Sequence, residues 1–122
     1  MTNRLGFYRC EICGNIVQVL HSGQGELVCC GEAMELLSAH TLNEEKQEKH
    51  VPVFSDDKVK VGSEAHPMIP EHYIMFIQAV SEDNKEIKTK FLSPNELPEM
   101  SIGTDNYSKA YEYCNIHGLW KS

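Results

Sequence analysis

The stretch Tyr73-Ile74-Met75-Phe76-Ile77-Gln78-Ala79-Val80 is the most strongly apolar segment of this 122-residue chain. Only Gln78 interrupts it, so both of its faces are apolar, as expected of a strand that is buried on both sides. A membrane-spanning helix needs about 18 consecutive apolar residues, and no window of the sequence approaches that length. We therefore predict a central β-strand here and no association with a membrane.

The segments around this strand have the pattern of shorter strands. Lys58 to Val61 alternates between polar and apolar residues, and Gly62 ends it. Residues 87–91 alternate in the same way, which gives one core face and one wet face. Residues 51–54 form a short strand that Pro52 interrupts, and residues 107–113 form a last strand that leads into Cys114. Short strands with regular turns predict a mostly β chain whose larger part is an immunoglobulin-like antiparallel β-sandwich.

Four of the five cysteines lie near the N-terminus, as the motif Cys10-Glu11-Ile12-Cys13 and the adjacent pair Cys29-Cys30. Four thiols at such spacing indicate a metal site, and a glycine follows each pair and lets backbone amides turn back toward the sulfurs. The alternatives are a redox disulfide within the first pair and a disulfide between the adjacent cysteines. Four thiolates suit zinc and iron alike, so the sequence leaves the metal open.

The four-thiol cluster belongs to a small N-terminal unit, which we predict over residues 1–37. Short strands are expected at residues 16–20 and 26–28, joined by a hairpin turn at residues 22–25. Such a unit is too small for a large apolar core, so the metal is expected to supply much of its folding free energy. A polar linker over residues 38–47 and a second domain over residues 48–122 complete the predicted organisation.

A second set of soft and borderline donors lies in the second domain. Cys114 and His117 stand in the string Cys114-Asn115-Ile116-His117-Gly118, and His50, His66 and His72 lie upstream. A closed zinc site needs only four ligands, whereas one thiolate and four imidazoles suit a redox iron or copper better. Five ligands on a metal that accepts six leave one position open for a substrate.

The charge of the chain limits its partners. The sequence has 18 acidic and 11 basic residues, a formal net charge of -7. This balance argues against nucleic acid as a partner, because phosphate binding needs clustered positive charge. The first residues lack the apolar region of an export signal, and five cysteines in a chain that is not exported favour a reducing cytoplasm.

These motifs resemble those of a known family. The strings Glu48-Lys49-His50-Val51-Pro52, Ala65-His66-Pro67-Met68 with His72-Tyr73, and the terminal Tyr113 to Lys121 resemble the superoxide reductases. The first cysteines resemble the desulforedoxin or rubredoxin-like metal-binding domain. Together they are similar to the desulfoferrodoxin family, the two-iron class of superoxide reductase, over nearly the whole chain.

The resemblance implies two iron ions per chain. One would be bound by the four N-terminal thiolates of Cys10, Cys13, Cys29 and Cys30. The catalytic iron would be bound by four histidines in a plane and one axial thiolate, which correspond to His50, His66, His72, His117 and Cys114. The implied activity is the one-electron reduction of superoxide to hydrogen peroxide. Lys49 would attract the anion, and Glu48 would bind the oxidised iron. The family also implies a rubredoxin as electron donor and a homodimer.

Two other classes of function account for part of the sequence. A copper electron carrier on a β-sandwich also uses an upstream histidine and a late cysteine–histidine pair. It usually adds a weak axial methionine, and no methionine follows Met100. A zinc-stabilised interaction module explains the four N-terminal thiols but not the four histidines with Cys114. His21 and His40 are expected to be solvated rather than to bind metal.

Overall fold

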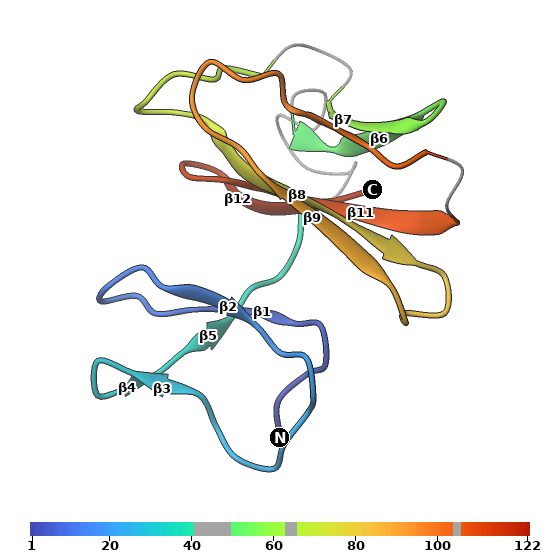
Figure 1. Ribbon diagram of the computed structural model, residues 1–122. Coiled ribbons are helices and arrows are strands. Elements are labelled where there is room, and N and C mark those ends of the chain that lie inside the picture. The colour runs from blue at the N-terminus through green and yellow to red at the C-terminus, as the bar shows by residue number, and fades with distance from the viewer. Residues whose placement is uncertain (41–49, 63–65, 104–105) are drawn as a thin grey trace. The chain divides into compact units, whose positions relative to one another are not determined.

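The computed structural model describes residues 1–40, 50–62, 66–103 and 106–122. It divides into two compact units, Met1–Ser38 and Ala39–Ser122 (Figure 1). Nearly all of the regular structure is β, as the sequence predicted. No helix in the described ranges is long and apolar enough to cross a membrane.

The first unit has a small antiparallel sheet and a separate hairpin. Strands β1 (Phe7–Arg9), β2 (Ile16–Gln18) and β5 (Glu35–Leu36) form the sheet in the order β2-β1-β5. Strands β3 (Val28–Cys29) and β4 (Glu32–Ala33) form the hairpin. The predicted hairpin at residues 22–25 is wrong, because residues 16–18 pair with β1 and Val28 pairs with Ala33.

The apolar core of the first unit is thin. Its buried hydrophobic residues are Phe7, Tyr8, Cys10 and Val19. Ile12, Leu20 and Val28 are more than half exposed. Burial of so few side chains contributes little stabilisation, so this unit depends on another source of folding free energy.

The second unit is an antiparallel β-sandwich, again as predicted. One sheet has the order β12-β11-β8-β9 and the other the order β10-β7-β6 (Figure 1). The strands of the four-stranded sheet are β8 (Ile74–Ser81), β9 (Ile87–Phe91), β11 (Tyr107–Cys114) and β12 (Gly118–Lys121). Those of the three-stranded sheet are β6 (Pro52–Ser55), β7 (Lys58–Val61) and β10 (Glu99–Ser101). Strand β8 lies between β11 and β9, which explains its long apolar run.

One continuous core lies between the two sheets. Ile77 and Ala79 of β8 and Ala110 of β11 face Val59 of β7 and Met100 of β10, and all five are fully or almost fully buried. Pro52 is tolerated because it is the first residue of β6, where the sheet order leaves that strand at an edge. Cys114 belongs to the same core cluster, so the metal-ligand candidate and the apolar core share one interior.

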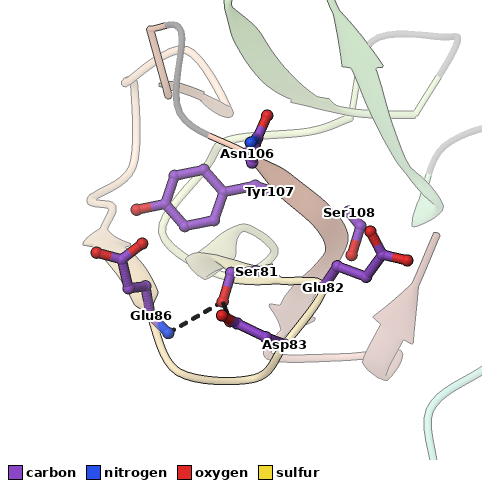
Figure 2. A pocket seen from close by; sticks show the side chains of 7 residues that line it. All are labelled: Ser81, Glu82, Asp83, Glu86, Asn106, Tyr107 and Ser108. Carbon is purple, nitrogen blue, oxygen red and sulfur yellow. Dashed lines mark hydrogen bonds between the residues drawn. The ribbon is translucent and has the colours of Figure 1, made fainter.

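A polar hollow lies at one end of the four-stranded sheet, where the turn between β8 and β9 meets the start of β11 (Figure 2). Its side chains hold the turn in place. Ser81 donates a hydrogen bond to the Asp83 carboxylate at 2.7 Å and accepts one from the Glu86 amide at 3.0 Å. The Ser81 hydroxyl lowers the pKa of Asp83. These side chains form the hydrogen bonds of the turn and include none of the predicted metal ligands. We therefore assign the hollow a structural role.

Substitution of a core residue tests the described packing of the sandwich. Ile77→Ala removes a side chain that is completely buried in β8. We expect the second unit to lose roughly 2–5 kcal/mol of unfolding free energy, because the cavity cannot refill without shifting both sheets. Leu97→Ala is the matched control, since Leu97 is 72% exposed, and it should change stability by less than about 0.5 kcal/mol. Denaturant unfolding would measure both, and an equal effect of the two substitutions would contradict the described core.

Candidate metal centres

The four N-terminal cysteines converge on one point. Their four sulfurs lie within 4.8 Å of one another. The distance between the sulfurs of Cys13 and Cys29 is 3.6 Å, and between those of Cys29 and Cys30 it is 3.9 Å. A tetrahedral ion with metal–sulfur bonds of about 2.3 Å holds its sulfurs about 3.8 Å apart. The spacing therefore fits a bound ion and is far longer than the roughly 2.05 Å of a disulfide.

Two tight turns bring the sulfurs together. Gly14 follows Cys13 with φ of +83°, and Cys30 and Gly31 follow one another with φ of +54° and +78°. The first turn lets the Cys13 amide donate a hydrogen bond to the Cys10 sulfur at 3.4 Å. The second turn separates two adjacent cysteines enough for both sulfurs to face the same centre. Left-handed backbone at a non-glycine residue is strained, and here it lies at a candidate ligand.

The electrostatics of this cluster favour a cation. The Cys13 amide lowers the pKa of Cys10 to about 7. In contrast, hydrogen bonds shared with Cys13 and the other thiols raise the pKa of Cys30 to about 12. The four thiols cannot all ionise in the absence of a counter-charge, because thiolates this close repel one another. A bound metal ion provides that charge, so the donor set fits the predicted four-thiolate centre.

The second cluster has a different shape. The four histidines form a closed ring of neighbours in the order His50, His66, His72 and His117. Ring centroids of successive neighbours are 4.6, 4.8, 5.0 and 4.7 Å apart, and each pair meets edge to face. His50 and His72, at opposite corners, are 6.5 Å apart, close to the diagonal of a square with those sides. The four imidazoles therefore surround a single central position.

The fifth donor of this cluster is Cys114. Its sulfur lies 3.9 Å from Nδ1 of His117 and within 4.8 Å of a ring nitrogen of every histidine in the square. A square of four imidazoles with a thiolate as a fifth donor is not the tetrahedron of a closed zinc site. Five donors of this kind suit an iron that retains one open position.

The hairpin of β11 and β12 positions two of these donors. Cys114 pairs with Gly118, which leaves a three-residue loop that contains His117. Gly118 has φ of +81°, the left-handed conformation that such loops require. A register shift between Tyr113 and Cys114 bends the strand pair at the same place, as bulges beside functional sites often do.

The Asn115 side chain joins this loop to a third donor. It accepts a hydrogen bond from the Tyr73 amide at 2.9 Å and donates one to the Glu71 carbonyl at 3.1 Å. These two bonds enclose His72, so the loops that carry His72 and His117 are held together. The sequence motifs did not predict this role of Asn115, although the residue stands between the candidate ligands Cys114 and His117 in the sequence.

The remaining two histidines are more deeply buried. His50 comes two residues before β6, and His66 precedes the loop that leads to β8; they are 1% and 5% exposed. His72 and His117 are half-buried, so the cluster is closed on one side and partly open on the other. Glu48 and Lys49, which the family resemblance singled out, lie outside the described residues.

Glu112 is a further residue that the sequence analysis missed. It lies on β11 two residues before Cys114, and it is completely buried. One carboxylate oxygen is 3.8 Å from Nδ1 of His50, and burial raises the pKa of the carboxyl well above its usual value. Ligand histidines typically direct their second nitrogen to a carboxylate, which orients the ring. The available signal was a charged residue at a core-facing position between two tyrosines.

Buried polar atoms test whether a metal fits here. Nε2 of His72 and both carboxylate oxygens of Glu112 are buried without a hydrogen-bond partner among the described residues. A buried polar atom without a partner costs on the order of 1–3 kcal/mol. A cation at the centre of the square gives the imidazole nitrogens a partner and compensates the charge of the thiolate and carboxylate. The residues present therefore fit the predicted iron centre.

Comparison with known proteins agrees with both centres. Residues 2–37 match the family described as "Desulfoferrodoxin, N-terminal domain", and residues 42–122 match "Desulfoferrodoxin". Desulfoferrodoxin of Desulfarculus baarsii is 48% identical over 100% of this chain and 98% of its own. Desulforedoxin of Megalodesulfovibrio gigas is 56% identical over 28% of this chain and 92% of its own.

A solved structure is also similar to this chain over its full length. The superoxide reductase from Treponema pallidum superposes with a TM-score of 0.74 at 29% identity, over 100% of this chain and 99% of that one. The two family matches together cover almost all residues, and one relative is nearly half identical over its full length. These similarities agree with the two metal clusters. The chain therefore belongs to the desulfoferrodoxin family.

Proposed function

We propose that this chain is a superoxide reductase that converts superoxide to hydrogen peroxide. The observation that carries the proposal is the square of four imidazoles with the Cys114 thiol as a fifth donor. The similarity to the Treponema pallidum superoxide reductase supports it. Superoxide takes up one electron and two protons in this reaction, and no oxygen is released.

The donor set explains why an iron at this place suits the reaction. Reduced iron would supply the electron to superoxide, and an electron donor would then restore it. Neutral imidazoles leave the centre cationic, which favours an anionic substrate, and a thiolate donates electron density to the metal. His72 and His117 lie on the partly open side, where water can deliver the protons.

We assign the attraction of superoxide to Lys49. It directly precedes His50, one of the four histidines of the square, in the sequence. A positive charge next to a cationic site raises the local concentration of a small anion, which matters more in a chain of net charge -7. We assign to Glu48 the binding of the oxidised iron after the product has left. Both roles rest on the family resemblance and on position in the sequence.

We further propose that residues 1–37 and 48–122 act as separate domains, with iron in the four-cysteine centre. The division of the cysteines supports this, since the first cluster takes all its ligands from Met1–Ser38 and the second from Ala39–Ser122. As partners we propose a rubredoxin as electron donor and a second copy of the chain. The edge strand β9, where Phe91 is 78% exposed, supports a dimer. Cysteines that gather in metal-binding clusters, rather than pairing as disulfides, support a cytoplasmic location.

Cys13→Ser tests the separation of the domains. We expect it to abolish the first metal centre, because one of its four thiolates is lost, and to spare superoxide reduction. Metal analysis should show one ion retained in the second domain, and pulse radiolysis should give an unchanged rate. Loss of the reaction while that ion remains bound would contradict the separation.

Cys114→Ser tests the fifth donor. A hydroxyl is a poor and largely protonated ligand, so the thiolate-to-iron absorption of the second centre and most of the activity should disappear. Iron occupancy of this centre is expected to fall as well. The absorption of the four-cysteine centre serves as an internal control, because it should persist. If the second centre keeps both its spectrum and its activity, Cys114 is not a ligand.

Lys49→Ala tests the attraction of the substrate. We expect the second-order rate with superoxide to fall roughly tenfold and to depend less on ionic strength, because one nearby positive charge is removed. Lys60→Ala is the matched control, since Lys60 is an exposed lysine of β7 that belongs to neither cluster, and it should leave the rate unchanged. Pulse radiolysis at two salt concentrations would measure both variants.

Glu48→Ala should behave differently from Lys49→Ala. The encounter rate should stay nearly unchanged, while the spectrum of the oxidised iron should shift, because the carboxylate acts only after the product leaves. Equal rates for the unmodified protein and Lys49→Ala at low salt would assign the attraction to the metal site alone.

A further inference from the structure

Trp120 touches two of the four histidines of the square. Its indole is 3% exposed and lies on β12, next to the loop that carries His117. The indole stacks on the His50 ring with centroids 4.9 Å apart and planes 14° apart. Its Nε1 donates a hydrogen bond of 3.1 Å to the backbone carbonyl of His117. One side chain therefore contacts adjacent corners of the square.

His40 packs against the same indole. Its ring centroid is 4.8 Å from that of Trp120, and the planes are tilted by 44°. The backbone fixes this contact, because the His40 amide donates to the Leu119 carbonyl at 2.8 Å and the Lys121 amide donates to the His40 carbonyl at 3.0 Å. His40 is thus half-buried and paired with β12, in contrast to the solvated residue expected from the sequence.

We propose that Trp120 is a positioning residue of the histidine–cysteine centre and that His40 acts on the centre through it. The inference rests on the proposed function in one respect, which is that a metal ion occupies the square of histidines. In this arrangement the indole fixes the plane of the His50 ring and restrains the His117 loop. His40 in turn packs against the indole and restrains it.

The chemistry of the stack favours the metal-bound state. An imidazole that binds a cation carries part of its positive charge, and an indole face is the strongest aromatic partner for such a group. A parallel stack at this distance also limits rotation of the His50 ring. Glu112 approaches Nδ1 of the same ring at 3.8 Å, so His50 is restrained by a carboxylate at its edge and by an indole at its face.

The hydrogen bond to His117 adds a second restraint. His117 lies in the three-residue loop between Cys114 and Gly118, and the loop position determines where its ring points. The backbone carbonyl of His117 accepts a hydrogen bond from the indole N–H of Trp120 on the next strand. A phenylalanine at position 120 would keep an aromatic face for His50 and lose this donor, so the two contacts can be separated by mutation.

The experiment uses the full chain loaded with Co²⁺, whose absorption reports the donors around it without any superoxide chemistry. We expect Trp120→Leu to alter the absorption of the histidine–cysteine centre and to speed release of that ion to a chelator by at least about tenfold, the lower range for residues that support ligands. Trp120→Phe should have a smaller effect on both. The four-cysteine centre should be unchanged in spectrum and release rate.

Phe76→Leu is the matched control for the loss of a buried aromatic residue. Phe76 lies on β8 of the same sheet, is 8% exposed and stacks on Tyr113 with ring centroids 5.9 Å apart. It should lower thermal stability but leave the Co²⁺ spectrum unchanged. If Trp120→Leu and Phe76→Leu release the ion at equal rates and neither alters the spectrum, Trp120 only contributes to packing and the proposal is wrong.

The role of His40 needs a pair of variants. His40→Ala should speed ion release less than Trp120→Leu does, and His40→Phe should restore the original rate, because an aromatic ring again supports the indole. His21→Ala is the control, since His21 is an exposed histidine of the first unit. If His40→Ala leaves ion release unchanged, or if His40→Phe does not restore it, His40 does not act through Trp120.

The result is independent of the reaction itself. Should the loaded protein fail to reduce superoxide, the proposed function fails, while the Co²⁺ spectrum and release rates still report whether Trp120 and His40 position the ligands. Conversely, unchanged spectra and release rates in the Trp120 variants would overturn the inference in a protein that remains fully active.

Discussion

The antiparallel pairing of β11 with β8 is the constraint on which the second centre depends. It sets Cys114 opposite Ile74 at the end of the sheet, directly beside the loop that carries His72. The hairpin to β12 then returns His117 to the same place, and Asn115 closes the two loops on each other. A slip of one residue in this register would turn Cys114 and Glu112 to the opposite face of the sheet and dissolve the site.

The site is formed at a cost to the core. Cys114, His50 and Glu112 occupy buried positions that apolar side chains would fill at lower free energy. A cation at the centre of the square offsets that cost, because the ring nitrogens can bind to it and its charge balances the anionic groups. Stability and function are therefore linked in this unit. Trp120 stacks on His50 and packs against His40, so these aromatic contacts contribute both to the core and to the position of a candidate ligand.

The first unit also depends on metal binding, but there the metal compensates for a small apolar core. Its apolar core is small, and its two tight turns include strained backbone at Cys30. Metal binding to four thiolates contributes on the order of 10 kcal/mol or more in small metal-dependent folds. The unit thus has little need of a large core, and its exposed apolar residues are compatible with a stable fold.

The sequence by itself determined the donors and the local strands. Cysteine and histidine types, their spacing and the alternation over residues 58–61 are local properties, and they predicted the sandwich and the two donor sets. The alternation over residues 87–91 predicted a strand correctly but its core face wrongly, because β9 is an edge strand whose residues are exposed or half-buried. Only the tertiary structure decided which strands pair, so the expected hairpin at residues 22–25 was wrong and the roles of Glu112, Asn115 and His40 went unseen. Each of those roles depends on a neighbour 40 or more residues away or on burial, and pairing between distant segments leaves no periodic signal in the chain.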